Sequence, residues 1–255
     1  MTNFLNDLMG MQPAASAHAA QIDWMLELLH WFVLVLFIGW TIFFVYTLVR
    51  FSAKRNPKAD YRGLTNPTYK YTEYVVIACD VIFLIVLAIP LWVARVNEFP
   101  SKEGALQVRA IGEQFKWTIH YPGPDGKMGK VDFKFVDKNN PLGRDMDDPN
   151  GKDDVVILDL LHVPLNKTVI INVSSKDVIH SFKILQMRVC QDAMPGLSIP
   201  LWFKPTKEGK YEIVCAQLCG LGHYGMRGFC TVESQAEFDK WITEKAKAGP
   251  GGSYE

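Results

Sequence analysis

The sequence lacks an excess of charge of either sign: its 255 residues include 27 Lys and Arg and 27 Asp and Glu, for a formal net charge of zero. A protein that binds nucleic acid by neutralising phosphates needs a basic surplus, so no nucleic-acid partner is predicted. The sequence also contains no C-x-x-C-H motif, which excludes a covalently attached c-type haem.

Lys and Arg are absent from the first 49 positions. Because a cleaved signal peptide would begin with a basic segment, the first hydrophobic run is not predicted to be one. Two hydrophobic runs, Leu28–Val49 and Tyr74–Ala94, are nearly free of charge, because only Asp80 interrupts the second. About 20 apolar residues are needed for an α-helix to cross a bilayer. We therefore predict a transmembrane hairpin in residues 1–95, with helices at about 26–50 and 74–95; the alternative is a pair of buried core helices.

The short segment between the two runs is basic. Segments rich in Lys and Arg stay on the cytoplasmic side of a membrane, so both termini and the rest of the chain are predicted to lie on the outer side. The basic residues of this segment are Arg50, Lys54, Arg55, Lys58, Arg62 and Lys70.

After the hairpin, charged residues become frequent, and short β-rich stretches such as FKWTIHY and KTVIINVSS alternate with turn signals such as PGPDG. This alternation is typical of an all-β sandwich or Greek-key barrel, which we place at residues 96–233. Residues 234–255 are predicted to form a C-terminal helix, opened by a capping box of Ser234 and Glu237, and a flexible tail.

The segment VCAQLCGLGHYGM contains a C-x3-C-x3-H-x2-M pattern formed by Cys215, Cys219, His223 and Met226. Thiolate, imidazole and thioether are the soft ligands that suit copper. A Cys215–Cys219 disulfide is the alternative, but it leaves the histidine and the methionine unexplained. Two cysteines can bridge two copper ions, and each ion then needs its own histidine, so a second histidine must come from elsewhere in the chain.

Among the remaining histidines, His180 in SSKDVIHSF is the best candidate, because it lies between two predicted strands. His120 and His162 are more typical of structural histidines on strands. His18 and His30 lie before or within the first membrane run.

The segments GEQFKW, DVIHSF, QDAMPG and YEIVCAQLCGLGHYGM resemble subunit II of haem–copper cytochrome c oxidases, and the resemblance covers nearly the whole chain. It implies a two-helix hairpin followed by a cupredoxin-like Greek-key domain that holds a dinuclear copper A centre. It implies further that electrons pass from cytochrome c, or another haem c donor, through this centre to haem in subunit I. There oxygen is reduced to water at haem and copper B, coupled to proton pumping.

Residue by residue, the resemblance implies two bridging cysteines, one histidine for each copper ion, a weak methionine ligand and a weak backbone-carbonyl ligand. These are Cys215 and Cys219, His180 and His223, Met226, and Gln217, respectively. Family members often carry Glu at the position of Gln217, where it helps to hold magnesium at the contact with subunit I. An amide carries no charge, so magnesium binding is left open.

Other positions also match the family or depart from it. Phe115 replaces the first tryptophan of the aromatic segment, where electrons are thought to enter, and Trp117 retains the second; packing in the core is the alternative for both. Asp177 matches a position that docks cytochrome c. Glu73 matches the mouth of a proton path into subunit I, with a simple interfacial charge as the alternative. Asp80 could extend that path or pair with a neighbouring subunit, and both remain open.

Two related classes are disfavoured. A quinol oxidase subunit would lack the copper ligands, and nitrous oxide reductase is soluble with a large extra domain. The expected setting is a bacterial inner (plasma) membrane, with the copper domain on the periplasmic side and oxidase subunit I, further oxidase subunits and the lipid bilayer as partners. Cys190 and Cys230 are additional to the family pattern, and a disulfide between them is left open.

Overall fold

The computed structural model describes residues 4–247, except 59, 60, 62, 64, 65, 138, 139 and 141. Arg62 of the basic segment and the predicted C-terminal tail therefore lie outside the described residues. The chain divides into two compact units. One comprises Met1–Met11 and Gln21–Phe99, and the other comprises Gln12–Ala20 and Pro100–Glu255.

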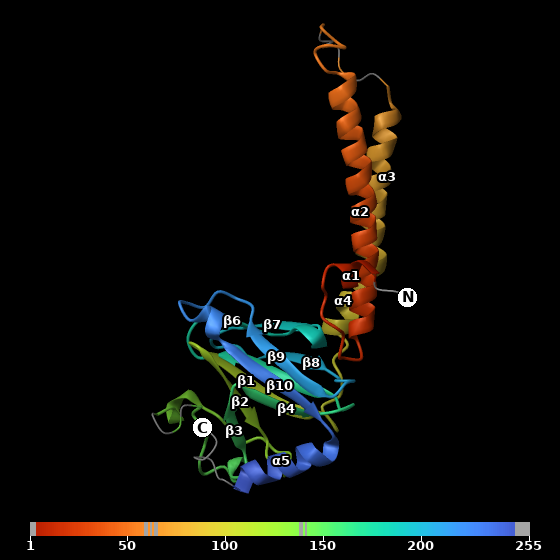
Figure 1. The fold of residues 1–255 in the computed structure, drawn as a ribbon. Coiled ribbons are helices and arrows are strands. Elements are labelled where there is room, and N and C mark those ends of the chain that lie inside the picture. The colour runs from red at the N-terminus through yellow and green to blue at the C-terminus, as the bar shows by residue number, and fades with distance from the viewer. Residues whose placement is uncertain are drawn as a thin grey trace. The chain divides into compact units, whose positions relative to one another are not determined.

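The first unit is helical. Its long helix α2 lies beside the run formed by α3, η1 and α4 (Figure 1), and Phe32 meets Phe83 with ring centroids 4.9 Å apart. Both runs are long and apolar enough to cross a membrane, and no residue of their most apolar windows is buried, which contradicts the alternative of core helices. The elements are α1 (Phe4–Leu8), α2 (Ala19–Arg50), α3 (Thr68–Ile82), the π-helical η1 (Phe83–Ala88) and α4 (Ile89–Val96).

The π-helical turn η1 ends two residues before Pro90. Proline has no N–H and its ring collides with the carbonyl four residues earlier, which here belongs to Val86 inside η1. Widening the helix at this point relieves that collision and lets the apolar run continue into α4.

Helix α2 begins at Ala19, seven residues before the start expected from hydrophobicity. The Glu27 carboxylate accepts hydrogen bonds from the backbone N–H groups of Leu5 and Asn6, each at 2.9 Å, and so satisfies the first turn of α1. The Asn6 side chain donates to the Asp23 carbonyl at 2.8 Å. These polar contacts stabilise the first two turns of α2, where hydrophobicity gives no signal.

The second unit is a sandwich of two five-stranded sheets, with strand orders β3-β2-β1-β5-β8 and β4-β10-β9-β6-β7. This confirms the predicted fold class, two membrane-length helices followed by an all-β domain. The strands are β1 (Leu106–Glu113), β2 (Lys116–Tyr121), β3 (Val155–Leu158), β4 (Leu160–Pro164), β5 (Val169–Ser175), β6 (His180–Ile184), β7 (Val189–Ala193), β8 (Ile199–Phe203), β9 (Gly209–Cys215) and β10 (Arg227–Glu233). Short 3-10 turns are η2 (Phe133–Phe135), η3 (Pro149–Gly151), η4 (Leu185–Met187) and η5 (His223–Gly225), and the closing helix is α5 (Gln235–Lys247).

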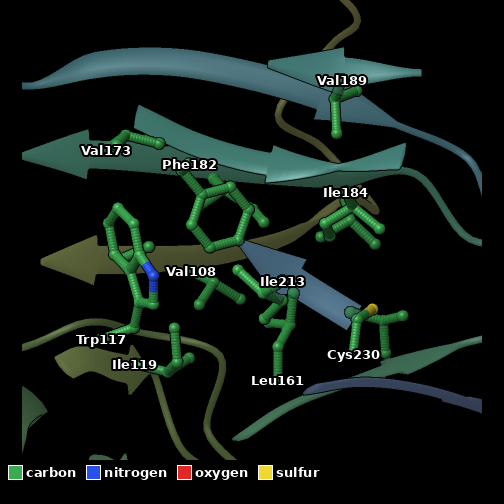
Figure 2. Packing of buried hydrophobic residues seen from close by; sticks show 14 of the residues in the cluster. Val108, Trp117, Ile119, Leu161, Val173, Phe182, Ile184, Val189, Ile213 and Cys230 are labelled. Carbon is green, nitrogen blue, oxygen red and sulfur yellow. The ribbon is translucent and has the colours of Figure 1, made fainter. Parts of the chain in front are cut away.

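The core lies between the two sheets (Figure 2). Val108 and Trp117 of one sheet face Phe182 and Ile213 of the other, and all four are fully buried. Along β1 buried and half-buried residues alternate, as expected for a strand with one face on the core.

Helix α5 begins with the predicted capping box. The Ser234 hydroxyl donates to the Glu237 carboxylate at 2.7 Å, and the Glu237 backbone N–H donates back to the Ser234 hydroxyl oxygen at 3.3 Å. Phe238 and Ile242 then bury the apolar face of the helix on the sandwich.

Residues 12–20 belong to the β unit, which the sequence did not indicate. The Ala15 N–H donates to the Gln186 carbonyl at 2.8 Å, and the Ser16 hydroxyl donates to the Met187 carbonyl at 2.8 Å. An isolated β-bridge joins Ser16 to Pro205. The N-terminal segment thus adds to the edge of the sandwich.

A Cys190–Cys230 disulfide, left open above, is wrong for this fold. Cys190 lies on β7 and is exposed, whereas Cys230 lies on β10 and is buried in the core. Strands β6 and β9 separate them, so three strand spacings put their Cα atoms about 14 Å apart. A disulfide allows no more than about 7 Å.

Candidate metal centre

Three buried side chains converge at one end of the sandwich. Cys215 ends β9, Cys219 follows in the next loop and His180 begins β6. The two sulfur atoms are 3.8 Å apart, and His180 Nδ1 lies 3.9 Å from Cys215 Sγ. The ligand atoms of all three residues lie within 4.8 Å of one another, so the group could hold a metal ion.

The other three residues implied as ligands surround the same sulfur atoms. His223 Nδ1 is 3.5 Å from Cys219 Sγ, and Met226 Sδ is 3.8 Å from it. The Gln217 carbonyl oxygen is 3.2 Å from Cys215 Sγ. The structure therefore brings together all six residues, although 35 positions separate His180 from Cys215.

The loop that carries the ligands, residues 216–226, is held by backbone contacts. The Ala216 N–H donates to the Ser181 carbonyl at 2.9 Å, and the Gln114 side-chain amide donates to the Cys219 carbonyl at 2.6 Å. Gly220 has φ +139°, and a side chain there would lie 2.7 Å from Gln114 Nε2. Glycine is needed at this position for both conformation and space.

Asp177 positions His180. Its carboxylate accepts from His180 Nε2 at 2.8 Å and from the backbone N–H groups of Gln114 and Val178, each at 2.7 Å. Partial burial raises the pKa of Asp177, but the hydrogen bonds from His180 and the two amides outweigh it and lower the pKa overall. An ionised Asp177 leaves Nδ1 of the imidazole facing the cysteines. Sequence reasoning missed this contact, for which the three-residue spacing in DVIH was the available signal.

The Cys219 thiol is held in its neutral form. Burial, reinforced by the neighbouring Cys215, raises the pKa of Cys219 to about 11. A metal ion that binds the thiolate must therefore displace a proton at neutral pH.

The two aromatic residues of GEQFKW have different environments. Trp117 is fully buried, with its ring centroid 6.0 Å from His180 and 5.1 Å from Phe182. Phe115 is 37% exposed and lies against Gly220 and Gly222 of the ligand loop. The structure thus gives Trp117 the surroundings of a core residue and gives Phe115 a place at the surface beside the ligand loop.

We expect Gly222→Ala to disturb the metal centre, because its Cβ would overlap the ring of Phe115. The metal content of the purified chain should fall to about half or less, since a shift of the loop moves His223. The matched control is Gly225→Ala, at a position with nothing within 4 Å of an added Cβ. If Phe115→Ala fails to restore metal binding to Gly222→Ala, the clash is not the cause.

The remaining histidines of the β unit have other partners. His162 lies 3.1 Å from Glu233 and stacks on Trp241, and His18 lies beside Trp202. His120 Nε2 lies 2.7 Å from the Asp154 carboxylate, with both side chains fully buried.

The pair of His120 and Asp154 predicts a pH effect on stability. Burial, with help from Arg109 and Arg144, lowers the pKa of His120 below its ordinary 6.5, although Asp154 opposes this. The neutral His120 therefore makes its full contribution to the free energy of unfolding above pH 6.5. Below pH 6.5 the unfolded state takes up the proton, and the free energy of unfolding falls by at most about 1.4 kcal/mol per pH unit. The melting temperature of the β domain, followed by circular dichroism at pH 7.0 and 5.5, measures this difference in stability. A melting temperature equal at both values would contradict it, and His120→Gln should remove the difference.

Glu73 lies on α3 and is exposed. Asp80 follows seven residues later on the same helix, and seven residues are close to two helical turns, so the two carboxylates share a face of α3.

Comparison with known proteins finds similar sequences and structures. The family model "Cytochrome C oxidase subunit II, periplasmic domain" matches residues 106–232. The alternative cytochrome c oxidase subunit 2 of Bradyrhizobium diazoefficiens is 31% identical over 233 residues, covering 91% of this chain and 83% of the relative. The cytochrome c oxidase subunit 2 of Cereibacter sphaeroides is 30% identical, covering 96% and 82%. Among solved structures, the periplasmic domain of subunit II of cytochrome oxidase from Bradyrhizobium japonicum is 28% identical, covers 58% of this chain and 96% of that one, and has a TM-score of 0.43.

Proposed function

The chain belongs to the cytochrome c oxidase subunit II family, and from this premise we propose that it holds a dinuclear copper A centre. Through that centre it accepts electrons from a haem c donor and passes them to haem in subunit I. Oxygen reduction and proton pumping then take place in the partner subunit.

The observation that carries this proposal is the pairing of each cysteine with its own histidine. His180 lies at Cys215 and His223 lies at Cys219, while the two sulfur atoms face each other at 3.8 Å. A mononuclear blue copper site needs one cysteine, two histidines and a weak methionine. A pair of sulfur atoms with one imidazole beside each instead suits two metal ions, which Cys215, Cys219, His180 and His223 would hold.

The bound copper pair would supply one-electron redox chemistry, and the chain supplies a rigid, dry environment. His180 and Cys215 are held at the ends of adjacent strands, because β6 and β9 pair through Phe182 and Cys215. Asp177 holds the His180 ring from behind. Met226 is almost fully buried and immediately precedes β10. Ligands fixed in this way move little when the electron arrives or leaves.

The remaining roles follow from family membership. Glu73 serves as the entrance of a proton path on the membrane unit. Gln217 is exposed, so its side-chain oxygen is free to contribute to a magnesium site at the contact with subunit I. Phe115 and Trp117 lie where electrons enter, and Asp177 belongs to the docking region. The two membrane-length helices anchor the chain with its β domain on the outer side.

The test is to purify the full chain in detergent, add copper, count copper per chain and record the EPR spectrum of the oxidised form. Two copper ions and a seven-line spectrum, from one unpaired electron shared by two nuclei, are expected. One copper ion with a four-line spectrum, or no copper, would overturn the proposal.

A further inference from the structure

Large apolar side chains project into solvent from the ligand loop. Leu221 is 107% exposed and Tyr224 is 84% exposed, although both lie within two residues of a proposed copper ligand. Exposed apolar groups clustered at a functional site usually mark a surface that another molecule covers.

Phe115 extends this surface. Its ring lies against Gly220 and Gly222, the two neighbours of Leu221 in the chain, so Phe115 lies beside the loop segment that carries Leu221. We call Phe115, Leu221 and Tyr224 the ligand-loop patch. Because the Gln114 side chain binds the Cys219 carbonyl, this patch rests on a fixed part of the loop.

The charges around the patch nearly cancel. The segments that carry the proposed ligands, or that bind or pair with them, contain five acidic and four basic residues. The acidic residues are Glu113, Asp159, Asp177, Asp192 and Glu212, and the basic residues are Lys116, Lys176, Lys183 and Arg227.

Several of these charges are also paired directly. The Glu113 carboxylate lies 3.0 Å from the Lys176 ammonium and 3.8 Å from that of Lys116. Arg227 lies 3.4 Å from Glu212, and Asp177 is engaged by His180. Paired charges of opposite sign produce little field at a distance. The whole chain also has no net charge.

We propose that the ligand-loop patch docks an electron-donating haem protein through apolar contact, and that the donor's docking face carries little net charge. This inference rests on the proposed function and specifies its partner. A strongly basic donor relies on an acidic surface to steer its approach, and the charges around the patch give an acidic excess of only one residue. Affinity then comes from burying the exposed side chains of the patch, with the donor haem brought close to the sulfur pair.

The test uses the purified oxidase complex that contains this chain, with two probes: lysine-rich mitochondrial cytochrome c and the same cytochrome with its lysines acetylated, which removes their charge. We expect kcat/KM for both probes to change by less than about threefold between about 10 and 200 mM ionic strength. A fall of more than about tenfold for the lysine-rich probe, with the acetylated probe unaffected, would overturn the inference.

Two variants sharpen the test. Leu221→Ser should lower kcat/KM about tenfold through KM, with unchanged melting temperature and copper EPR spectrum. The control Leu160→Ser, on β4, should change none of these quantities.

Lys176→Gln removes the closest partner of Glu113. It should raise kcat/KM for the lysine-rich probe about threefold at low ionic strength, and this kcat/KM should then decrease as salt is added. If Leu221→Ser instead prevents co-purification with subunit I, the patch is a subunit contact and the inference is wrong. Absence of the dinuclear EPR signal from the unmodified complex would remove the proposed function itself, whereas strong salt dependence with that signal intact would overturn only this inference.

Discussion

Replacing Cys219 with serine is expected to abolish the proposed dinuclear centre. Cys219 is the residue at which the site converges, because its sulfur lies 3.8 Å from Cys215 Sγ, 3.5 Å from His223 Nδ1 and 3.8 Å from Met226 Sδ. A serine hydroxyl is a harder ligand than a thiolate and does not ionise near neutral pH, so it cannot bridge two copper ions. Copper content should fall from two ions per chain to one or none, the seven-line spectrum should disappear, and electron transfer from the donor should slow about 100-fold or more.

The matched control is Cys190→Ser. Cys190 is exposed on β7 and is not part of the metal-binding group of His180, Cys215 and Cys219. Copper analysis, EPR and stopped-flow reduction of the two variants side by side separate a ligand effect from a general effect of losing a thiol. A Cys219→Ser chain that keeps two copper ions and the seven-line spectrum would contradict the assignment of the bridge.

Trp117→Ala is expected to produce the largest loss of stability in the β domain. Trp117 is fully buried between the sheets and packs edge-on against Phe182, with centroids 5.1 Å apart (Figure 2). Truncating a buried tryptophan removes its apolar contacts and leaves a cavity, so unfolding should become about 3–5 kcal/mol easier. Denaturant unfolding of the full chain in detergent, followed by the near-UV CD of the β domain, measures this.

Trp117→Phe distinguishes packing from a role in electron entrance. The indole Nε1 has no hydrogen-bond partner within the described part of the chain, so replacement by phenylalanine loses no hydrogen bond. Trp117→Phe should therefore lower the free energy of unfolding by about half as much as Trp117→Ala, or less. Phe115→Ala should lower the free energy of unfolding by still less, because Phe115 is partly exposed. If Trp117→Phe keeps its stability but loses rapid reduction of copper by the donor, the indole carries electrons. Unchanged reduction assigns it to the core.

The sequence by itself determined features that depend on neighbouring residues. Hydrophobicity located the two membrane-length runs, because crossing a bilayer requires an unbroken apolar stretch. The pair Ser234 and Glu237 located the start of α5, because a capping box closes over three residues. Cys215, Cys219, His223 and Met226 lie within twelve positions, so their spacing already limited how far apart the ligands can lie.

Only the tertiary structure decided the features that join distant segments. The contact of His180 with Cys215 depends on the pairing of β6 with β9, and the placement of Phe115 on the ligand loop depends on where β1 and β2 meet that loop. Parallel pairing of β1 with β5 and the addition of residues 12–20 to the sandwich leave no periodic signal in the chain. The separation of Cys190 from Cys230 likewise follows from strand order, which no count of cysteines contains. Such contacts are selected by burial of the whole core at once, and for that reason local residue patterns cannot specify them.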